Sequence, residues 1–249
     1  MNPALWILLG VVGAGCVVLG WAVVIEPRLL VIREVNIESA AWPPERSPIR
    51  VALVADLHVG SPHNDLDRVD AIVSAVNARK PHIILLLGDY VSVSVVGGRP
   101  VAPESITPRL ARLEAEAGVV AVLGNADWIF DGERIRQAIE AVGIAVLENA
   151  VAVFETDDGP VSVAGIADDS TRSPDVAGTL STTEDNHPVI VAAHDPAIFS
   201  EVSNGVVATF AGHTHGGQVS VPFLGALHVP GRAPRAWAHG HVALEGRQM

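Results

Sequence analysis

The sequence predicts an α/β protein in which two sheets pack face to face with helices outside them, preceded by one transmembrane helix. Short apolar runs, typical of buried strands, recur from Ile49 onward. Amphipathic helical patterns separate the first of these runs, whereas the second half, from Val151, consists mainly of expected strands. Before all of them lies one long segment that carries no charge.

The uncharged segment is Ala4–Ile25, which is apolar or glycine throughout. As a helix it would span roughly 33 Å, enough for a hydrocarbon core of about 30 Å. Trp6 and Trp21 fall near its two ends, where interfacial tryptophan is favoured. A cleaved signal peptide is the alternative, but no Lys or Arg precedes the run and the run is long. We therefore predict a transmembrane anchor at residues 1–27.

The charges beside the anchor predict its orientation. Arg28 and Arg33 follow the segment, and only the amino terminus is basic before it. The positive-inside rule then places the rest of the chain in the cytoplasm, as a single-pass protein of the cell inner membrane. Cys16 is the sole cysteine, so an intramolecular disulfide is excluded.

Residues 28–48 are expected to be a linker with one strand at Leu30–Ile37, because Pro43, Pro44 and Pro48 break any helix. Residues 49–249 have a suitable length for one globular domain. Its strands are expected at Ile49–Ala55, Ile83–Leu87, Val119–Leu123, Val151–Phe154, Val161–Ile166, Val189–Ala193, Val206–Ala211, Val219–Val221 and Val242–Leu244.

Three helices are expected between the first strands. Asn64 or Asp65 caps one that runs to about Arg79. Thr107-Pro108 starts the second, which ends near Gly118, and Asp131 caps the third. The segment Val91–Pro103 has no helical period and is expected to be a loop or hairpin.

A polar motif follows each of five apolar runs. The motifs are Asp56-Leu57-His58, Gly88-Asp89, Gly124-Asn125-Ala126-Asp127, Ala193-His194-Asp195 and Gly212-His213-Thr214-His215. Open α/β sheets collect their ligands at such strand ends. Since residues i and i+2 of a strand point to the same side, Asp56 and His58 can aim at one metal while Leu57 turns to the core. Oxygen and nitrogen donors without thiolate suit Mn, Fe, Zn or Mg.

The ordered set resembles the calcineurin-like metallophosphoesterase family, whose pattern is D-x-H, G-D, G-N-H-D, a lone His and G-H-x-H. The resemblance runs from about Arg50 to Gln218, and with the long apolar N-terminus it looks like the membrane-associated bacterial branch. It implies a four-layer α/β/β/α sandwich. Family members usually continue with a further strand and a Pro-rich return, whereas this chain stops at Met249. We expect either a shortened C-terminus or a second sheet that closes differently.

The resemblance also implies two divalent metal ions, with Mn the most effective in vitro. By correspondence Asp89 bridges the ions. Asp56, His58 and His215 would bind the first ion. Asn125, His194 and His213 would bind the second.

Asn125 and Asp127 are the catalytic residues that the resemblance implies. The usual histidine between them is Ala126, which cannot donate a proton, so metal binding is expected to survive and activity to be reduced. Three explanations stay open: an engineered inactivating substitution, a natural enzyme with a good leaving group such as a nucleotide phosphate, and a pseudoenzyme.

The function implied is hydrolysis of a phosphodiester or pyrophosphate bond in a phosphorylated small molecule. Characterised members of the branch are phosphodiesterases or pyrophosphatases, some acting on lipid-linked substrates such as UDP-diacylglucosamine. A non-catalytic metal-binding scaffold at the membrane and a protein phosphatase are the alternatives. A net charge of −12 argues against nucleic-acid binding, and the sequence indicates no obligate protein partner.

Other polar and apolar residues near the motifs are weaker candidates. Trp128–Phe130 and Pro222–Leu224 could accept acyl chains, although core packing is at least as plausible for the first of them. Asp168 and Asp169 follow a strand and are expected in an exposed turn rather than in the cleft. Six histidines match no motif and are expected at the surface or in loops: His63, His82, His187, His228, His239 and His241.

Overall fold

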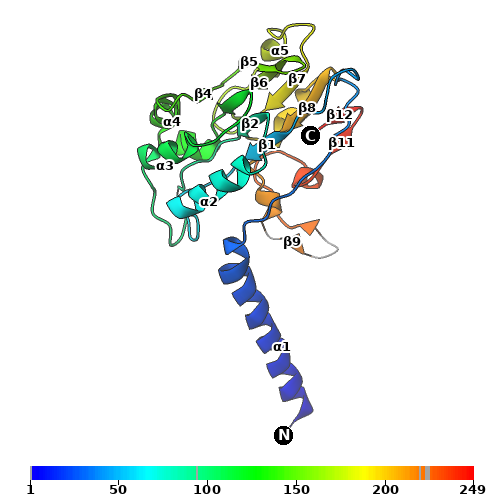
Figure 1. Cartoon of the computed structure of the whole chain (residues 1–249). Helices are drawn as coiled ribbons and strands as arrows, with labels where there is room; N and C mark the ends of the chain where they lie inside the picture. Colours follow the sequence, from blue (N-terminus) through cyan, green and yellow to red (C-terminus); the bar gives the residue numbers. More distant parts are fainter. Residues whose placement is uncertain (1, 94, 219, 222–224) are drawn as a thin grey trace. The chain divides into compact units, whose positions relative to one another are not determined.

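A computed structural model describes residues 2–93, 95–218, 220–221 and 225–249. The chain divides into two compact units, Met1–Glu34 and Val35–Met249 (Figure 1).

The first unit consists mainly of one continuous helix. Helix α1 (Pro3–Gly20) begins with Asn2, whose side chain accepts the N–H of Ala4, and with Pro3 in the favoured first position. A π-helical turn at Trp21–Ile25 and a 3₁₀ turn (Glu26–Arg28) continue it. It is apolar on every side, which is typical of a membrane span. By length and composition Pro3–Arg28 can cross a membrane. The expected strand at Leu30–Ile37 was wrong, because these residues form no regular structure.

The second unit begins with a four-stranded parallel sheet. Its strands are β1 (Val51–Val54), β2 (Ile83–Leu86), β3 (Gly118–Ala121) and β4 (Ala145–Val146), in that order. Every residue of β2 is fully buried, because a central strand of a parallel sheet is covered on both faces. The three strands expected here were confirmed with ends that differ by at most two residues, whereas β4 was not expected.

Three helices cover the outer face of this sheet. Helix α2 (Leu66–Asn77) is capped by Asp65, as predicted. Helix α3 is Pro103–Leu110, so the prediction from Thr107-Pro108 was wrong: Pro103 occupies the first turn and Pro108 lies inside the helix. Helix α4 (Asn125–Glu140) is interrupted at Asp131. As predicted, Asp131 caps the part that follows, because its side chain accepts the backbone N–H of Arg134. The helical residues before Asp131 were not predicted.

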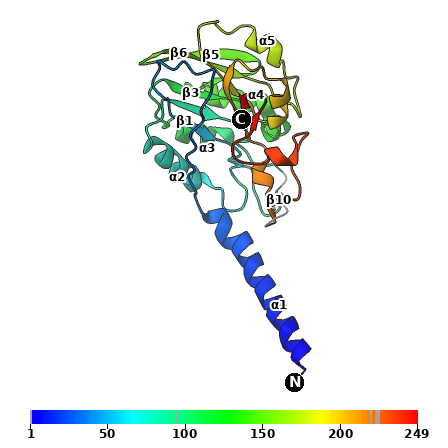
Figure 2. The ribbon, with the colours of Figure 1, turned by 90° about the vertical axis from the view of Figure 1, so that its right-hand side faces the viewer.

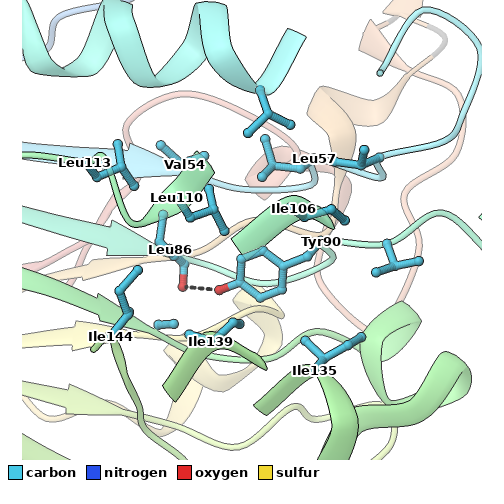
Figure 3. Packing of buried hydrophobic residues seen from close by; sticks show 14 of the residues in the cluster. Val54, Leu57, Leu86, Tyr90, Ile106, Leu110, Leu113, Ile135, Ile139 and Ile144 are labelled. Carbon is cyan, nitrogen blue, oxygen red and sulfur yellow. Dashed lines mark hydrogen bonds between the residues drawn. The ribbon is translucent and has the colours of Figure 1, made fainter. Parts of the chain in front are cut away.

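Apolar side chains fill the space between the helices and the first sheet (Figure 3). Tyr90 lies among Ile106, Leu110 and Ile139 with its ring fully enclosed. Its hydroxyl donates to the carbonyls of Leu86 at 3.2 Å and Val122 at 2.9 Å, so this polar atom is satisfied within the core.

The second sheet is mixed. Strand β5 (Ala150–Thr156) is antiparallel to β6 (Gly159–Gly165), and β6, β7 (Val189–Ala192) and β8 (Val206–Phe210) run parallel. Its inner face packs on the first sheet through residues such as Leu85 and Val163. Its outer face is covered by α5 (Val176–Leu180) and the 3₁₀ helix η3 (Pro196–Glu201). The resulting order is helices, sheet, sheet and short helices, the predicted sandwich with a thin last layer (Figures 1 and 2).

Short elements complete the second unit. They are the 3₁₀ turns η4 (His215–Gly217) and η5 (Arg235–Trp237), and the antiparallel pairs β9 (Ser220–Val221) with β10 (Gly225–Ala226) and β11 (Ala243–Leu244) with β12 (Arg247–Gln248). Arg247 ties the last pair to η3 by donating to the carbonyls of Phe199, within η3, and of Val202, just after it, both at 3.2 Å. Val219 and the predicted acyl-contacting segment Pro222–Leu224 lie outside the described residues.

Candidate metal centre

The candidate ligands lie just beyond the carboxyl ends of five strands, three in the first sheet and two in the second. They are Asp56 and His58 after β1, Asp89 after β2, Asn125 after β3, His194 after β7, and His213 and His215 after β8. Parallel strands of one sheet end at a common edge, and the two edges meet here. The structure brings all seven side chains together.

One group of donors consists of Asp56, His58, Asp89 and His215. His58 Nε2 lies 3.1 Å from His215 Nε2 and 3.4 Å from Asp89 Oδ2. His215 Nε2 lies 3.3 Å from Asp56 Oδ1. Asp56 also accepts the backbone N–H of His213, at 3.0 Å to Oδ2, so this carboxylate joins the edges of the two sheets.

A second group consists of Asp89, His194 and His213, with Asn125 beside them. His194 Nε2 lies 3.1 Å from both His213 Nδ1 and Asn125 Oδ1, and 3.4 Å from Asp89 Oδ2. This ring is completely buried, and its Nδ1 lies 2.7 Å from the carbonyl oxygen of Leu87. The carbonyl can only accept, so Nδ1 carries a hydrogen, and in the neutral ring the Nε2 lone pair faces the group.

Asp89 belongs to both groups. Its Oδ2 is 3.4 Å from His58 Nε2 and 3.4 Å from His194 Nε2. Its Oδ1 accepts the backbone N–H of Ala126 at 2.8 Å. The residue is 2% exposed. One carboxylate oxygen is thus held by the backbone N–H of Ala126, and the other lies between the two histidines.

The donor set fits divalent cations. Lone-pair atoms converge at His194 Nε2, where imidazole nitrogen, amide oxygen and carboxylate oxygen face one another at 3.1–3.4 Å. Such an arrangement is stabilised by a positive charge placed among the donors. Nitrogen and oxygen donors without thiolate suit Mn, Fe, Zn or Mg.

The electrostatic field of the carboxylates favours cations at this position. Burial lowers the pKa of His194, but the hydrogen bond and charge of Asp89, with the charge of Asp56, outweigh the burial and raise it to about 10. The field that holds a proton on Nε2 equally attracts a metal ion, which would compete with that proton.

The backbone is strained at most of these positions. Five ligand residues adopt the left-handed region that non-glycine residues rarely occupy: Asp56 (φ 53°), His58 (φ 39°), Asp89 (φ 58°), His213 (φ 68°) and His215 (φ 49°). Each costs of order 1–3 kcal/mol, and such residues cluster at functional sites. Strand β1 ends at Val54, so Asp56 and His58 reach one site through these turns and not through strand alternation, although Leu57 does enter the core.

Gly124 is required by close packing at the centre. A Cβ at this position would lie 2.2 Å from Asp89 Oδ1 and 2.7 Å from the ring of His194. Only glycine lets the start of α4 approach the shared carboxylate and the buried histidine at the same time.

Asp127 links the second and third motifs. It is fully buried, and its carboxylate accepts the backbone N–H groups of Asp89 at 2.7 Å, Tyr90 at 2.8 Å and Gly124 at 2.9 Å. Burial and the charge of Asp89 raise its pKa to about 7, against the three hydrogen bonds, which act to lower it. The residue holds the turn of Asp89 against the start of α4.

Three further aspartates border the centre. Asp168 is 1% exposed, so the expectation of an exposed turn was wrong for it; its Oδ2 accepts the N–H of Thr171 at 2.8 Å. Asp169 forms a two-point ion pair with Arg232. Asp195, for which the sequence pattern predicts no role, is 1% exposed and lies 3.7 Å from His213 Nε2.

The segment Trp128–Phe130, which was considered as a contact for acyl chains, is only partly exposed. Trp128 and Phe130 pack against the core cluster of the first sheet, whereas Ile129 is 64% exposed. The guanidinium of Arg172 stacks 4.2 Å from the Trp128 ring, which connects α4 to the second half of the domain. A cavity of 170 Å³ beside Asp56, between β1 and α2, is too small to enclose a lipid chain.

Comparison with known proteins identifies the family of the chain. The family model for calcineurin-like phosphoesterases matches residues 49–242, which include every candidate ligand. The chain belongs to this family. The family is metal-dependent, and its members are phosphoesterase hydrolases, as this protein is.

Several similar proteins are named as metallophosphoesterases or phosphodiesterases. The Bacillus subtilis protein YkuE, an uncharacterized metallophosphoesterase, is 27% identical over 91% of this chain and 77% of its own length. Phosphodiesterase YaeI of Escherichia coli is 27% identical over 85% of this chain and 73% of its own. A Danio rerio transmembrane protein with a metallophosphoesterase domain is 27% identical over 78% of this chain and 46% of its own.

Among solved structures, the NAD nucleotidase of Haemophilus influenzae aligns with a TM-score of 0.49 and 12% identity. The alignment covers 67% of this chain and 38% of that protein.

Proposed function

We propose that this protein is a membrane-anchored hydrolase that uses two divalent ions to cleave phosphodiester or pyrophosphate bonds. The observation that supports it best is the pair of donor groups that share Asp89 Oδ2. Asp56, His58, Asp89 and His215 would hold one ion. Asp89, Asn125, His194 and His213 would hold the other.

When bound, two such ions lower the pKa of a water molecule between them and neutralise charge on the phosphoryl oxygens. The residues of the chain supply the positions. Asp89 sets the spacing between the donor groups, because Ala126 fixes its other oxygen. The contact of His194 with the Leu87 carbonyl fixes the ring, and Asp127 holds Asp89 in register with Gly124, the residue before Asn125, through the backbone.

Ala126 narrows the reactions that this centre can accelerate. It is buried at the start of α4 and offers only its backbone N–H, which Asp89 already accepts. With no side-chain acid at this position, the proposed enzyme favours substrates whose leaving group departs without protonation, such as nucleotide phosphates. The same observation supports a second candidate, a metal-binding scaffold without turnover.

A lipid-linked phosphate, such as UDP-diacylglucosamine, is a narrower proposal motivated by the anchor. An anchored enzyme meets lipid substrates at high local concentration, and Ile129 presents an exposed apolar side chain beside the third motif. The small cavity beside Asp56 and the packing of Trp128 against the core give this proposal no further support.

A substrate panel on purified full-length protein in detergent tests these proposals. We expect close to two Mn²⁺ per chain and hydrolysis of bis-p-nitrophenyl phosphate that a chelator abolishes and Mn²⁺ restores. Phosphopeptides, which serve as the protein-phosphatase control, should turn over more slowly. Less than one metal per chain would refute the centre. If soluble nucleotide diphosphate sugars were hydrolysed faster than lipid-linked substrates of any acyl length, the proposal of a lipid substrate would be wrong.

We also propose that residues 1–27 form a membrane anchor, 28–48 a linker and 49–249 the catalytic domain, on the cytoplasmic side of the inner membrane. The apolar helix Pro3–Arg28 supports the anchor, and Arg28 at its end and Arg33 after it support the orientation. The full chain should stay in the membrane pellet after alkaline extraction. In spheroplasts its catalytic domain should resist added protease, and digestion there would reverse the orientation.

A further inference from the structure

The two ring nitrogens of His213 have different surroundings. Nδ1 lies 3.1 Å from His194 Nε2, inside the second donor group. Nε2 is buried and has no hydrogen-bond partner within the described part of the chain. A neutral ring that offers the Nδ1 lone pair to a cation carries its hydrogen on Nε2, so this arrangement buries an N–H that needs an acceptor.

The carboxylate of Asp195 is placed to supply that acceptor. Its Oδ2 lies 3.7 Å from His213 Nε2, and the side chain is 1% exposed. Its Oδ1 accepts the backbone N–H of Ala197 at 2.8 Å, and its Oδ2 accepts the hydroxyl of Ser170 at 3.4 Å. The short contact with the Ala197 backbone fixes the carboxylate, which follows β7 directly after the ligand His194.

A backbone segment covers the pair. Gly231 has φ +75°, and a Cβ there would lie 2.7 Å from Asp195 Oδ2 and 3.0 Å from His213 Nε2. The next residue, Arg232, is tied to Asp169, with Nε 2.9 Å from Oδ2. The segment therefore leaves little room for water at the pair, so the carboxylate is the acceptor available to a His213 N–H.

We propose that Asp195 is a positioning residue that accepts the Nε2 hydrogen of His213 and so turns its Nδ1 toward the second ion. The proposal rests on the two-ion function proposed above. Carboxylates in this relation fix the tautomer and orientation of a metal-binding histidine and raise its basicity. Asp195 would thereby set the affinity of the second ion without touching it.

Asp195→Asn in the full-length protein is the direct test. Asparagine keeps the volume and an oxygen for the Ala197 N–H, but it presents an NH₂ group to the His213 N–H. Titration of metal-free protein with Co²⁺, followed by calorimetry and visible absorption, should show one of two equivalents bound 10–100-fold more weakly and the other unchanged. Ser170→Ala, which removes the hydroxyl and keeps the carboxylate, should bind both equivalents like the unmodified chain.

Gly231→Ala provides a second variant, in which the added methyl pushes the pair apart. It should weaken the same Co²⁺ equivalent, including when Asp195→Asn proves too unstable to purify. Two equivalents of unchanged affinity in either folded variant would overturn the role of Asp195. Fewer than two equivalents in the unmodified chain would instead refute the two-ion function on which the proposal rests.

Discussion

Asp89→Asn is expected to lose far more metal than any substitution of a residue that belongs to one donor group. The carboxylate Oδ2 stands 3.4 Å from a histidine of each group, so the change removes the one negative charge that both ions would share. At an effective dielectric of 20, two unit charges about 4 Å apart have an interaction energy of about 4 kcal/mol. Each 1.4 kcal/mol of binding free energy corresponds to a tenfold change in affinity. We expect affinity to fall by about 10²–10³-fold and hydrolysis to reach background.

The comparison variants make this result specific. Asn125→Ala and His215→Ala each alter one group and should lose one ion. Asparagine at position 89 can still accept the Ala126 N–H, so the fold should persist and the thermal midpoint should change little. His63→Ala lies outside the motifs and should retain both ions. Metal content after dialysis at fixed free Mn²⁺ measures all four. Two ions retained by Asp89→Asn, with one lost by His63→Ala, would disprove the ligand assignment.

The strands could be predicted because their signal is local. Apolar runs such as Ile83–Leu87 are long enough for a buried parallel strand, and the polar residue that follows each run marks the ligand edge. The start of α3 was less predictable, because Pro103 and Pro108 are both compatible with a first helical turn. Pro103 is buried at the start of α3, and this burial cannot be read from the local sequence pattern.

Backbone strain and buried charge could not be predicted in the same way. Asp56 and His58 look like alternating strand residues, yet both adopt left-handed turns that only the surrounding structure can impose. The role of Asp195 also could not be predicted from the sequence. Its environment comes from Ser170 and Gly231, which are distant along the chain, and a polar residue after a strand is ordinarily solvated. The ligand residues can thus be predicted from the local sequence, whereas the groups that orient them are determined by tertiary contacts.

Ala126→His is expected to raise turnover of substrates with poor leaving groups by about 10²–10⁴-fold, the usual contribution of general acid–base assistance. Position 126 lies between Asn125 and Asp127 at the start of α4, and its backbone N–H contacts the shared carboxylate, so a side chain here begins within the centre. Alkyl phosphodiesters, whose alkoxide needs a proton, should gain most. Bis-p-nitrophenyl phosphate should gain little, because nitrophenolate leaves unprotonated.

The dependence on the leaving group distinguishes the two candidate functions. Ala126→Gln, which adds a side chain of similar size without an acid, should show no gain on either ester. Since Ala126 is 2% exposed, both variants are expected to lose about 1–3 kcal/mol of stability from overpacking, which thermal unfolding measures. An equal gain on both esters would reject the explanation from the leaving group. Silence of the unmodified chain and of Ala126→His, with two ions bound in each, would establish the scaffold, because a complete metal centre with its acid restored would then lack turnover.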